Sequence, residues 1–129
     1  MTEVFRKLNF KDQDPMLVMG APASFQEELS AVRTETTVHA RPKASTRYGF
    51  ALAFAPMKAD LLAAAGTILE CADAGAVLWF AYPKQTSRTF RSDLNRDLCA
   101  AALRGLGLQP VRQVAIDDDW SALRFKAAG

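Results

Sequence analysis

The sequence predicts a three-layer α/β sandwich, in which helices cover both faces of a mostly parallel β-sheet. Three observations support this fold. The short apolar runs MLVMGAP, YGFALAFAP and AVLWFAYP recur along the chain and are typical of strands buried on both faces. Stretches with helical spacing of apolar residues lie between them, so crossover helices are expected to join parallel strands. The chain ends in two β-like stretches across a turn too short for a crossover, which indicates an antiparallel hairpin.

The first part of the chain predicts a strand, a helix and a second, shorter strand. The first strand is expected at residues 16–21, because its apolar run ends in Gly-Ala-Pro. Ser24 and Glu27 then match the S-x-x-E pattern of a capping box, so a helix is predicted from there to about Arg33. A β-branched strand follows at residues 36–40, and the basic loop RPKAST separates it from the next strand.

The middle of the chain repeats the alternation of strand and helix. A buried strand is expected at residues 48–55, and residues 57–73 carry leucine and alanine on one face of a helix. Gly75 is expected to end that helix, because glycine favours the position after a helix C-terminus. The third buried strand is then predicted at residues 76–82, and Ser92 is expected to cap the next helix.

The end of the chain predicts a helix and a hairpin. Asp93 falls in the first turn of that helix, where a negative charge is favourable and where Arg96 can pair with it. The hairpin strands are expected at residues 111–116 and 121–126, on either side of the turn DDDW. No repeat or linker interrupts this order, so the 129 residues predict one domain, with residues 1–14 as an N-terminal extension.

The composition argues against several classes of protein. The 16 basic and 14 acidic residues leave a net charge of +2, which does not favour nucleic-acid binding. The apolar runs are much shorter than the ~20 residues of a membrane-spanning helix, and the charged N-terminus does not resemble a signal peptide. Cys71 and Cys99 are interpreted as small buried side chains in a reducing compartment. We therefore expect a cytoplasmic protein with no membrane contact.

Motifs of catalysis and metal binding are missing from the sequence. His39 is the only histidine, so a histidine cluster for a metal is excluded. Neither the G-x-S-x-G motif of α/β-hydrolases nor a Walker-type phosphate loop occurs. The acidic run at residues 117–119 is interpreted as turn chemistry. The sequence therefore predicts no metal site and no catalytic residue, and it does not favour an enzyme.

Basic and polar residues gather where the predicted strands end. In a parallel sheet the carboxyl ends of the strands share one edge, and ligands bind there. The residues expected at this edge are Gly20, Arg41, Lys43, Arg47, Lys58, Tyr82, Lys84, Arg88 and Arg91. The pattern predicts binding of a small anionic, phosphate-bearing ligand, through Lys84, Arg88, Arg91 and Arg41 with Gly20 and Tyr82 beside them. The alternative interpretation is that these cations only keep the edge of the sheet soluble.

The second half of the chain resembles a Rossmann-like methyltransferase domain. The segments YGFALAFAP, LLAAAGTILECADAG, AVLWFAYP, LCAAALRGLGL and VRQVAIDDDWSALRF follow the order of elements in that family. The resemblance implies S-adenosylmethionine as cofactor, with a glycine-rich turn after the first strand and an acidic residue after the second. This chain has Gly20-Ala21-Pro22 and His39-Ala40-Arg41 there, without a second glycine or an acidic residue, so no cofactor is predicted. A degenerate methyltransferase-like enzyme, with residues 20–22 lining the remaining cleft, is the alternative function.

The chain as a whole is similar to a family of small uncharacterised bacterial proteins that share a domain of unknown function. The segments that carry this resemblance are APASF, WFAYPK, TFRSDLNRD and DDDWSALRF. This second resemblance implies no activity. A third hypothesis is therefore a homodimeric interaction module that uses an apolar sheet edge or helix face.

Overall fold

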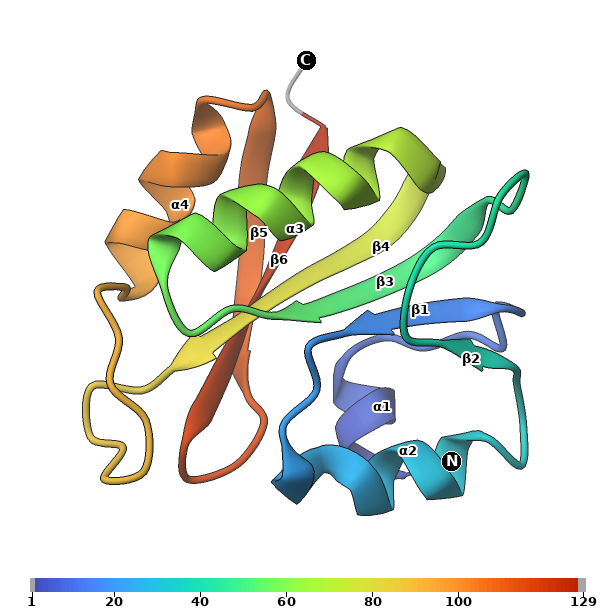
Figure 1. Ribbon diagram of the computed structural model, residues 1–129, viewed down its shortest axis with the longest axis horizontal. Helices are drawn as coiled ribbons and strands as arrows, with labels where there is room; N and C mark the ends of the chain where they lie inside the picture. Colours follow the sequence, from blue (N-terminus) through green and yellow to red (C-terminus); the bar gives the residue numbers. More distant parts are fainter. Residues whose placement is uncertain (1, 128–129) are drawn as a thin grey trace.

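The computed structural model describes residues 2–127, which form one six-stranded sheet with helices on both faces (Figure 1). The elements in chain order are α1 (Glu3–Lys7), β1 (Met16–Met19), the 3₁₀ helix η1 (Ala23–Phe25), α2 (Gln26–Val32), β2 (Val38–His39), β3 (Tyr48–Phe54), α3 (Lys58–Cys71), β4 (Ala72–Pro83), α4 (Arg96–Arg104), β5 (Leu108–Ala115) and β6 (Trp120–Ala127). The strand order is β2-β1-β3-β4-β6-β5. The first four strands of this order run parallel, and β6 runs antiparallel to both of its neighbours, β4 and β5, so the predicted fold class is confirmed.

The parallel part of the sheet contains a topological switch point between β1 and β3. Leu17 of β1 pairs with His39 of β2 on one side and with Ala51 of β3 on the other. The chain therefore moves outward from β1 to β2 and then crosses back over β1 to reach β3. In open α/β sheets, ligands bind outside the carboxyl ends of the two strands at such a point.

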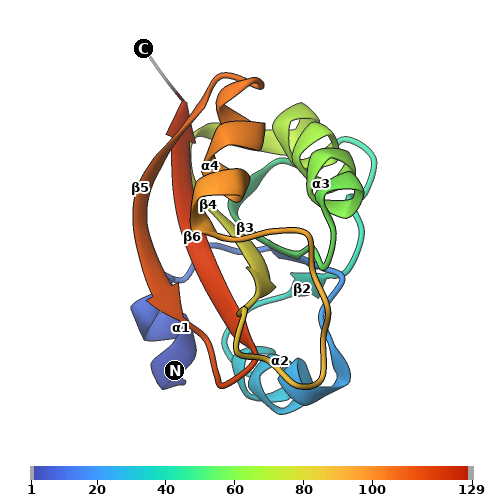
Figure 2. The ribbon, with the colours of Figure 1, turned by 90° about the vertical axis from the view of Figure 1, so that its left-hand side faces the viewer.

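The C-terminal hairpin extends the sheet in an unexpected order, because β6 and not β5 pairs with β4 (Figure 2). The register of this antiparallel ladder sets Trp120 opposite Pro83 and Ser121 opposite Tyr82. The first residues of β6 therefore lie beside the carboxyl end of β4, at the same edge as the ends of β1 and β3.

The sheet divides the apolar core into two parts, and β4 contributes to both. Leu78, Phe80 and Tyr82 lie in the cluster that contains the buried residues of α3 and α4. Trp79 and Ala81 lie in the other cluster, with the buried residues of α1 and α2. A strand buried on both faces explains the continuous apolar run of the sequence, since each fully buried large side chain contributes roughly 1.5–3 kcal/mol.

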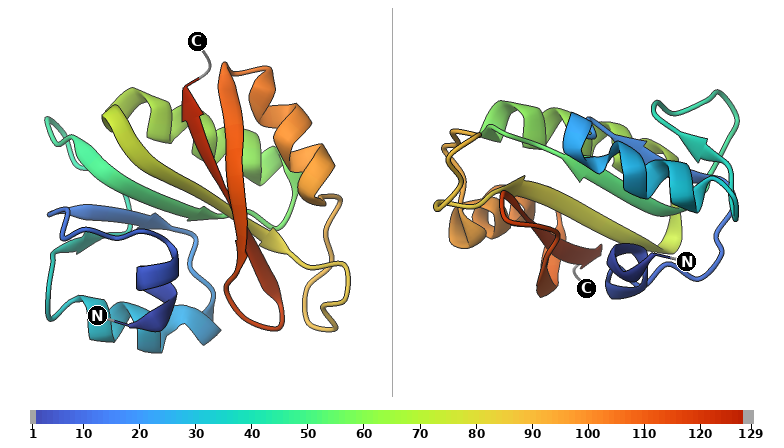
Figure 3. Two further views of the ribbon diagram at one scale, coloured as in Figure 1. Left: turned by 180° about the vertical axis from the view of Figure 1, so that it is seen from behind. Right: turned by 90° about the horizontal axis from the view of Figure 1, so that it is seen from below.

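Much of the predicted N-terminal extension is packed into the core. Phe5 and Leu8 are fully buried, and Phe10 is 1% exposed. The indole N–H of Trp79 donates a hydrogen bond to the carbonyl oxygen of Leu8 at 2.7 Å, so the segment is also tied to the sheet by a buried polar contact. Figure 3 shows α1 lying against the sheet when the molecule is seen from behind. The five residues of α1 are too few for a helical pattern to stand out in the sequence.

The predicted capping box at Ser24 is wrong. Residues 23–25 form η1, which runs directly into α2, and neither helix has a side-chain cap. Pro22 precedes η1 in an extended conformation. The chain therefore enters α2 through a tight 3₁₀ turn, and that turn places Ser24 inside helical structure instead of in front of it.

The last helix begins later than predicted, at Arg96. Its cap is Asn95, whose side-chain oxygen accepts a hydrogen bond from the backbone N–H of Leu98 at 2.9 Å. The Ser92 hydroxyl instead donates to the carbonyl oxygen of Pro56 at 2.5 Å, which ties the loop before α4 to the end of β3. The segment SDLNRD contains several residues that can cap a helix. Because the Ser92 hydroxyl is used in the contact with Pro56, the cap of α4 is Asn95.

The boundary between α3 and β4 was also predicted wrongly. The helix ends at Cys71 and β4 starts at Ala72, which pairs with Tyr48 of β3. Gly75, expected to end the helix, lies inside β4 with φ 76°. The register between β3 and β4 shifts in this region, and glycine can adopt the positive φ of such an irregularity.

We predict that Gly20→Ala destabilises the fold, because Gly20 holds β1 and β3 close together at their carboxyl ends. Gly20 has φ 68°, and a Cβ added to it would lie 2.8 Å from the carbonyl oxygen of Phe54. The left-handed conformation alone costs an alanine roughly 1–2 kcal/mol, so urea denaturation should show a loss of at least that size in the free energy of unfolding.

The matched control for this prediction is Gly105→Ala. Gly105 has φ −61°, and its added Cβ would lie 3.4 Å from the carbonyl oxygen of Ala102. This substitution should leave the free energy of unfolding unchanged or raise it by up to about 1 kcal/mol. Equal losses in the two variants would contradict a special packing role for Gly20.

Candidate functional site

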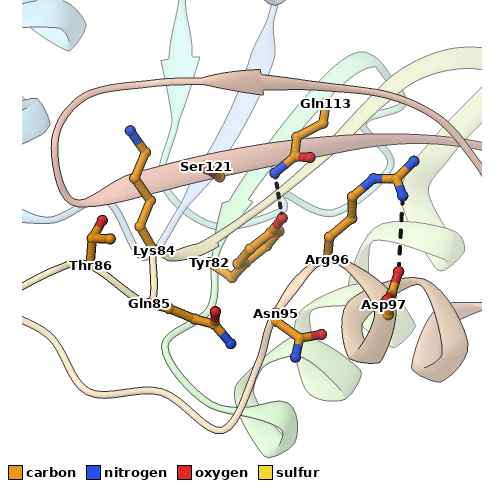
Figure 4. A pocket seen from close by; sticks show the side chains of 9 residues that line it. All are labelled: Tyr82, Lys84, Gln85, Thr86, Asn95, Arg96, Asp97, Gln113 and Ser121. Atoms are coloured by element: carbon orange, nitrogen blue, oxygen red, sulfur yellow. Dashed lines mark hydrogen bonds and ion pairs between the residues drawn. The ribbon is translucent and has the colours of Figure 1, made fainter.

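A cavity of about 560 Å³ opens where β4 ends, on the side of the sheet that α4 covers (Figure 4). Five parts of the chain line it: the end of β4, the loop that follows, the start of α4, β5 and β6. The side chains that matter for its chemistry are those of Tyr82, Lys84, Arg96, Gln113 and Ser121. We call this hollow the β4-exit cavity.

Two hydroxyl groups in the β4-exit cavity can donate hydrogen bonds to a ligand. The Tyr82 hydroxyl accepts a hydrogen bond from Gln113 Nε2 at 2.7 Å, which leaves its own hydrogen free. Burial raises the pKa of Tyr82 to about 12, so the phenol is protonated at neutral pH. The neighbouring Ser121 is 7% exposed, and its hydroxyl has no hydrogen-bond partner within residues 2–127.

The β4-exit cavity also carries positive charge. The Lys84 ammonium forms no ion pair or hydrogen bond with any residue in the described part of the chain. The Arg96 guanidinium lies 3.9 Å from Asp97, but both side chains are largely exposed and such a pair is worth little. The N-terminus of α4 adds backbone N–H groups and the positive end of the helix dipole. Cations and neutral donors therefore dominate the lining, and Asp97 is its one carboxylate.

A second hollow of about 470 Å³ adjoins the β4-exit cavity and shares Lys84 with it. Arg91 lines this second hollow. The Ser87 hydroxyl donates to Asp119 Oδ1 at 2.8 Å and accepts from the Phe90 N–H at 3.1 Å, so the loop after β4 is tied to the hairpin turn. The loop that carries Lys84 is therefore held by contacts at several points.

The residues predicted for a ligand site do not all meet. Tyr82 and Lys84 line the β4-exit cavity, whereas Arg91 lines only the adjoining hollow. Gly20 and Arg41 line a separate cavity of about 330 Å³ between β1, α2 and β2. Arg88 lines none of these three cavities. The prediction that Arg88 and Arg41 share a site with Lys84 therefore stays without support from these cavities.

Arg47 does not lie at the carboxyl edge, which corrects its predicted position. It precedes β3, and its guanidinium donates hydrogen bonds to the carbonyl oxygens of Glu70 and Ala72. Its Nε also lies 3.6 Å from Asp73. The loop after β2 returns to the opposite edge of the sheet before β3 begins, so Arg47 caps the C-terminal end of α3.

Among the five side chains that matter for the chemistry of the β4-exit cavity, three were not assigned to a ligand by sequence reasoning: Arg96, Gln113 and Ser121. The sequence suggested a surface pair between Asp93 and Arg96, but the Asp93 carboxylate accepts from the backbone N–H of Lys58 at 2.7 Å. Gln113 and Ser121 reach the cavity only because β6 inserts between β4 and β5. Their register could not be read from the sequence, because hairpin strands can add to a sheet in either order.

Aromatic side chains fill the topological switch point on the opposite side of the sheet from the β4-exit cavity. Phe25, which follows β1, contacts Phe54 at the end of β3, with ring centroids 4.9 Å apart. Trp120 contacts Phe54 at 5.1 Å, and Phe90 contacts Trp120 at 4.9 Å. Trp120 is only 1% exposed, and its indole N–H has no hydrogen-bond partner within residues 2–127. These four rings form a continuous row, which we call the aromatic row.

Comparison with proteins of known structure identifies the fold. No protein-family model and no curated protein matches the chain. Solved structures do: the N-methyltransferase NodS from Bradyrhizobium japonicum has 12% identity and a TM-score of 0.62 over 98% of this chain and 93% of its own. The glycopeptide N-methyltransferase MtfA in complex with S-adenosylmethionine has 11% identity and a TM-score of 0.63 over 95% and 91%. The DhpI–SAH complex has 10% identity and a TM-score of 0.61 over 97% and 82%.

The chain has a Rossmann-like methyltransferase fold. The predicted resemblance of the second half is confirmed at the level of the fold, and it extends over nearly the whole chain. At identities of 8–12% these likenesses concern the fold alone. Membership of the family of small bacterial proteins stays a prediction.

The residues at the switch point do not fit S-adenosylmethionine, the molecule bound to MtfA. The aromatic row occupies the crevice between the ends of β1 and β3. The position at which a Cβ of Gly20 would lie is filled by the carbonyl oxygen of Phe54. The cavity beside β2 carries the guanidinium groups of Arg33 and Arg41, which repel a sulfonium, and it has no carboxylate for a ribose.

The histidine His39 is engaged in a hydrogen bond, and the thiol of Cys99 is buried. His39 Nδ1 lies 2.5 Å from the Tyr48 hydroxyl, and Cys99 is a buried free thiol whose pKa is raised to about 12 by burial. Within residues 2–127, no group of three or more His, Cys, Asp or Glu side chains is arranged to hold a metal ion. None of the helices in this part of the chain has the length and apolarity needed to cross a bilayer.

We predict that Tyr82 contributes to a loss of stability at high pH. Its pKa is about 12 in the folded protein and near 10 when unfolded, so the unfolded state releases the proton first. The stabilisation is complete below pH 10 and disappears as the pH rises to 12. In urea denaturation at a series of pH values between 10 and 12, the free energy of unfolding should fall less steeply with pH in Tyr82→Phe than in the parent protein. The difference in slope should be up to ~1.4 kcal/mol per pH unit. Cys99→Ala should remove the separate contribution of the thiol, and unchanged slopes in Tyr82→Phe would contradict the buried neutral phenol.

Proposed function

We propose that this protein binds a small anionic ligand in the β4-exit cavity. The observation that carries the proposal is the Lys84 ammonium, which has no partner within residues 2–127 and belongs to a side chain that lines the cavity together with Arg96. In Figure 4, Lys84 and Arg96 lie on opposite sides of Tyr82, and the Lys84 ammonium extends away from Arg96. A ligand anion bound beside Lys84 would pair with a lysine that residues 2–127 leave without a partner.

The remaining groups of the cavity suit the same ligand. The Tyr82 phenol is protonated and the Ser121 hydroxyl is unpartnered, so both can donate to anionic or hydroxyl oxygens. The N-terminus of α4 favours negative charge. Phosphate accepts several charge-assisted hydrogen bonds at once, so a phosphate-bearing molecule would use this arrangement most completely. A volume of about 560 Å³ is in the range of small-molecule pockets.

The proposed role is binding without catalysis. A general acid or base works best with a pKa near the operating pH, and the buried phenol of Tyr82 is shifted away from that range, to about 12. The one carboxylate of the lining, Asp97, belongs to an exposed side chain beside Arg96. The cavity therefore offers recognition chemistry, and no residue in it is prepared for proton transfer.

Methyl transfer from S-adenosylmethionine is the second candidate function. The likenesses to NodS, MtfA and DhpI favour it, because all three match most of this chain. Against it stand the aromatic row and the arginine residues beside β2. The two functions use different places in the molecule, so binding experiments can separate them.

We predict that a phosphate-bearing probe binds through Lys84. Inorganic pyrophosphate, glucose 6-phosphate and AMP can be tested in parallel by isothermal titration calorimetry. Lys84→Ala should weaken the binding of the best probe about tenfold, since a hydrogen bond to a charged group is worth roughly 1.5–3 kcal/mol. A probe present at 100 times its dissociation constant should also stabilise the fold by about 2.7 kcal/mol in a thermal-shift assay.

Arg88→Ala is the matched control, since this cation lies four residues from Lys84 in the same loop but lines none of the three cavities. Its binding constant should stay within about twofold of the parent protein. Equal weakening by both substitutions would contradict the proposed site and indicate that the probe is held by nonspecific charge attraction. Binding of S-adenosylmethionine that is insensitive to Lys84→Ala would instead support the methyltransferase function.

A further inference from the structure

The separate cavity beside β2 combines an apolar wall with two arginine side chains. It measures about 330 Å³ and lies between β1, α2 and the edge strand β2. Val18 and Leu29 line it and are only 2% and 4% exposed, and Val38 lines it from β2. Arg33 and Arg41 line the same cavity. Core side chains and cations therefore meet at one place, which we call the β2 cavity.

The two arginine side chains have no acidic partner in the part of the chain that the structure describes. Neither forms an ion pair or a side-chain hydrogen bond there, and no residue that lines the β2 cavity has a carboxylate. Helical spacing of ~100° per residue turns Glu27 and Glu28 of α2 about 120° or more away from the side that lines the cavity. Glu35 lines a different hollow.

Arg41 is the more informative of the two cations. Arg33 directly follows α2, and a cation is favourable at the C-terminal end of a helix even without a ligand. Arg41 lies two residues after the end of β2 and has no such role in a helix. An anion bound in the β2 cavity would give Arg41 the partner that residues 2–127 do not supply.

The backbone adds a hydrogen-bond donor at the carboxyl end of β1. The ladder between β1 and β2 ends at the pair Leu17–His39. Gly20 lines the β2 cavity beyond this point, and its backbone N–H forms no hydrogen bond within residues 2–127. Asp14 lies at the opposite end of the ladder, where its carboxylate accepts from the Thr37 N–H at 3.0 Å. The carboxyl end therefore has a free donor beside the cations, and this carboxylate does not compete there.

We propose that the β2 cavity binds a small carboxylic acid with an apolar body, in its ionised form. A guanidinium group pairs with a planar carboxylate through two parallel hydrogen bonds, so Arg33 and Arg41 suit this group. The apolar body packs against Val18, Leu29 and Val38. A volume of about 330 Å³ is at the lower end of small-molecule pockets, which limits the body to a few carbon atoms. This site is distinct from the β4-exit cavity, because the two cavities share no lining residue.

Isothermal titration calorimetry of the full-length protein with sodium hexanoate and sodium benzoate tests the proposal. We expect both acids to bind, and hexanoate at least ~10-fold more tightly than acetate, because its additional methylene groups are buried. Hexanamide has the same body without the charge and should bind about tenfold more weakly than hexanoate. A protein that binds neither acid, or that binds hexanamide as tightly as hexanoate, would overturn the proposal.

Substitution of Arg41 tests the site itself. Arg41→Ala should weaken hexanoate binding about tenfold, and Arg41→Lys should fall between this variant and the parent protein, because lysine keeps the charge without the paired hydrogen bonds. Arg88→Ala is the matched control, since Arg88 is also an exposed cation but does not line the β2 cavity. Its affinity for hexanoate should stay within about twofold of the parent protein. Equal weakening in Arg41→Ala and Arg88→Ala would overturn the proposal.

Nuclear magnetic resonance locates the bound acid without relying on a substitution. Hexanoate should shift the backbone amide signals of Gly20, Arg33 and Arg41 more than those of residues 82–84, which belong to the β4-exit cavity and its surroundings. Shifts centred on residues 82–84 would place the acid in the other cavity and would also overturn the proposal. The side chains of Arg41 and Arg88 are exposed, so circular dichroism should show that their variants remain folded.

Discussion

The antiparallel ladder between β4 and β6 is the constraint on which the rest of this structure depends. It pairs Tyr82 with Ser121 and Pro83 with Trp120, at the end of a strand whose other edge pairs with β3. Because side chains alternate along β6, one residue of the pair Trp120–Ser121 points to each face of the sheet. Ser121 completes the polar cavity on the α4 side, and Trp120 completes the aromatic row on the α1 and α2 side. A shift of one residue in this register would move Trp120 and Ser121 to each other's face of the sheet, and both the polar cavity and the aromatic row would be lost.

The two faces of the carboxyl edge have consequently taken different chemical roles. On one face, three pairs of aromatic rings are in contact, with centroids 4.9–5.1 Å apart within each pair. These contacts stabilise the packing at the edge of the sheet where ligands bind in open α/β folds. On the other face, the Lys84 ammonium and the Ser121 hydroxyl have no side-chain partner among residues 2–127. The fold is shared with methyltransferases, whereas the ligand site that we propose lies beyond β4, on the other face of the sheet from the aromatic row. Fold alone therefore does not decide function here.

The sequence by itself determined the layer architecture and the strands of the central sheet. Continuous apolar runs are typical of strands buried on both faces, so the strands predicted at residues 16–21 and 48–55 lie close to the observed β1 and β3. The strand predicted at residues 76–82 ends close to the observed β4 but misses its first four residues. Tyr82 and Lys84 were also placed correctly beside one cavity, because they follow the end of such a strand directly. Only the tertiary structure decided that Asn95 and not Ser92 caps α4, that α1 enters the core, and that Arg96, Gln113 and Ser121 join Lys84. The physical reason is that local patterns set which residues are buried, whereas strand order and register depend on contacts between segments far apart in the chain.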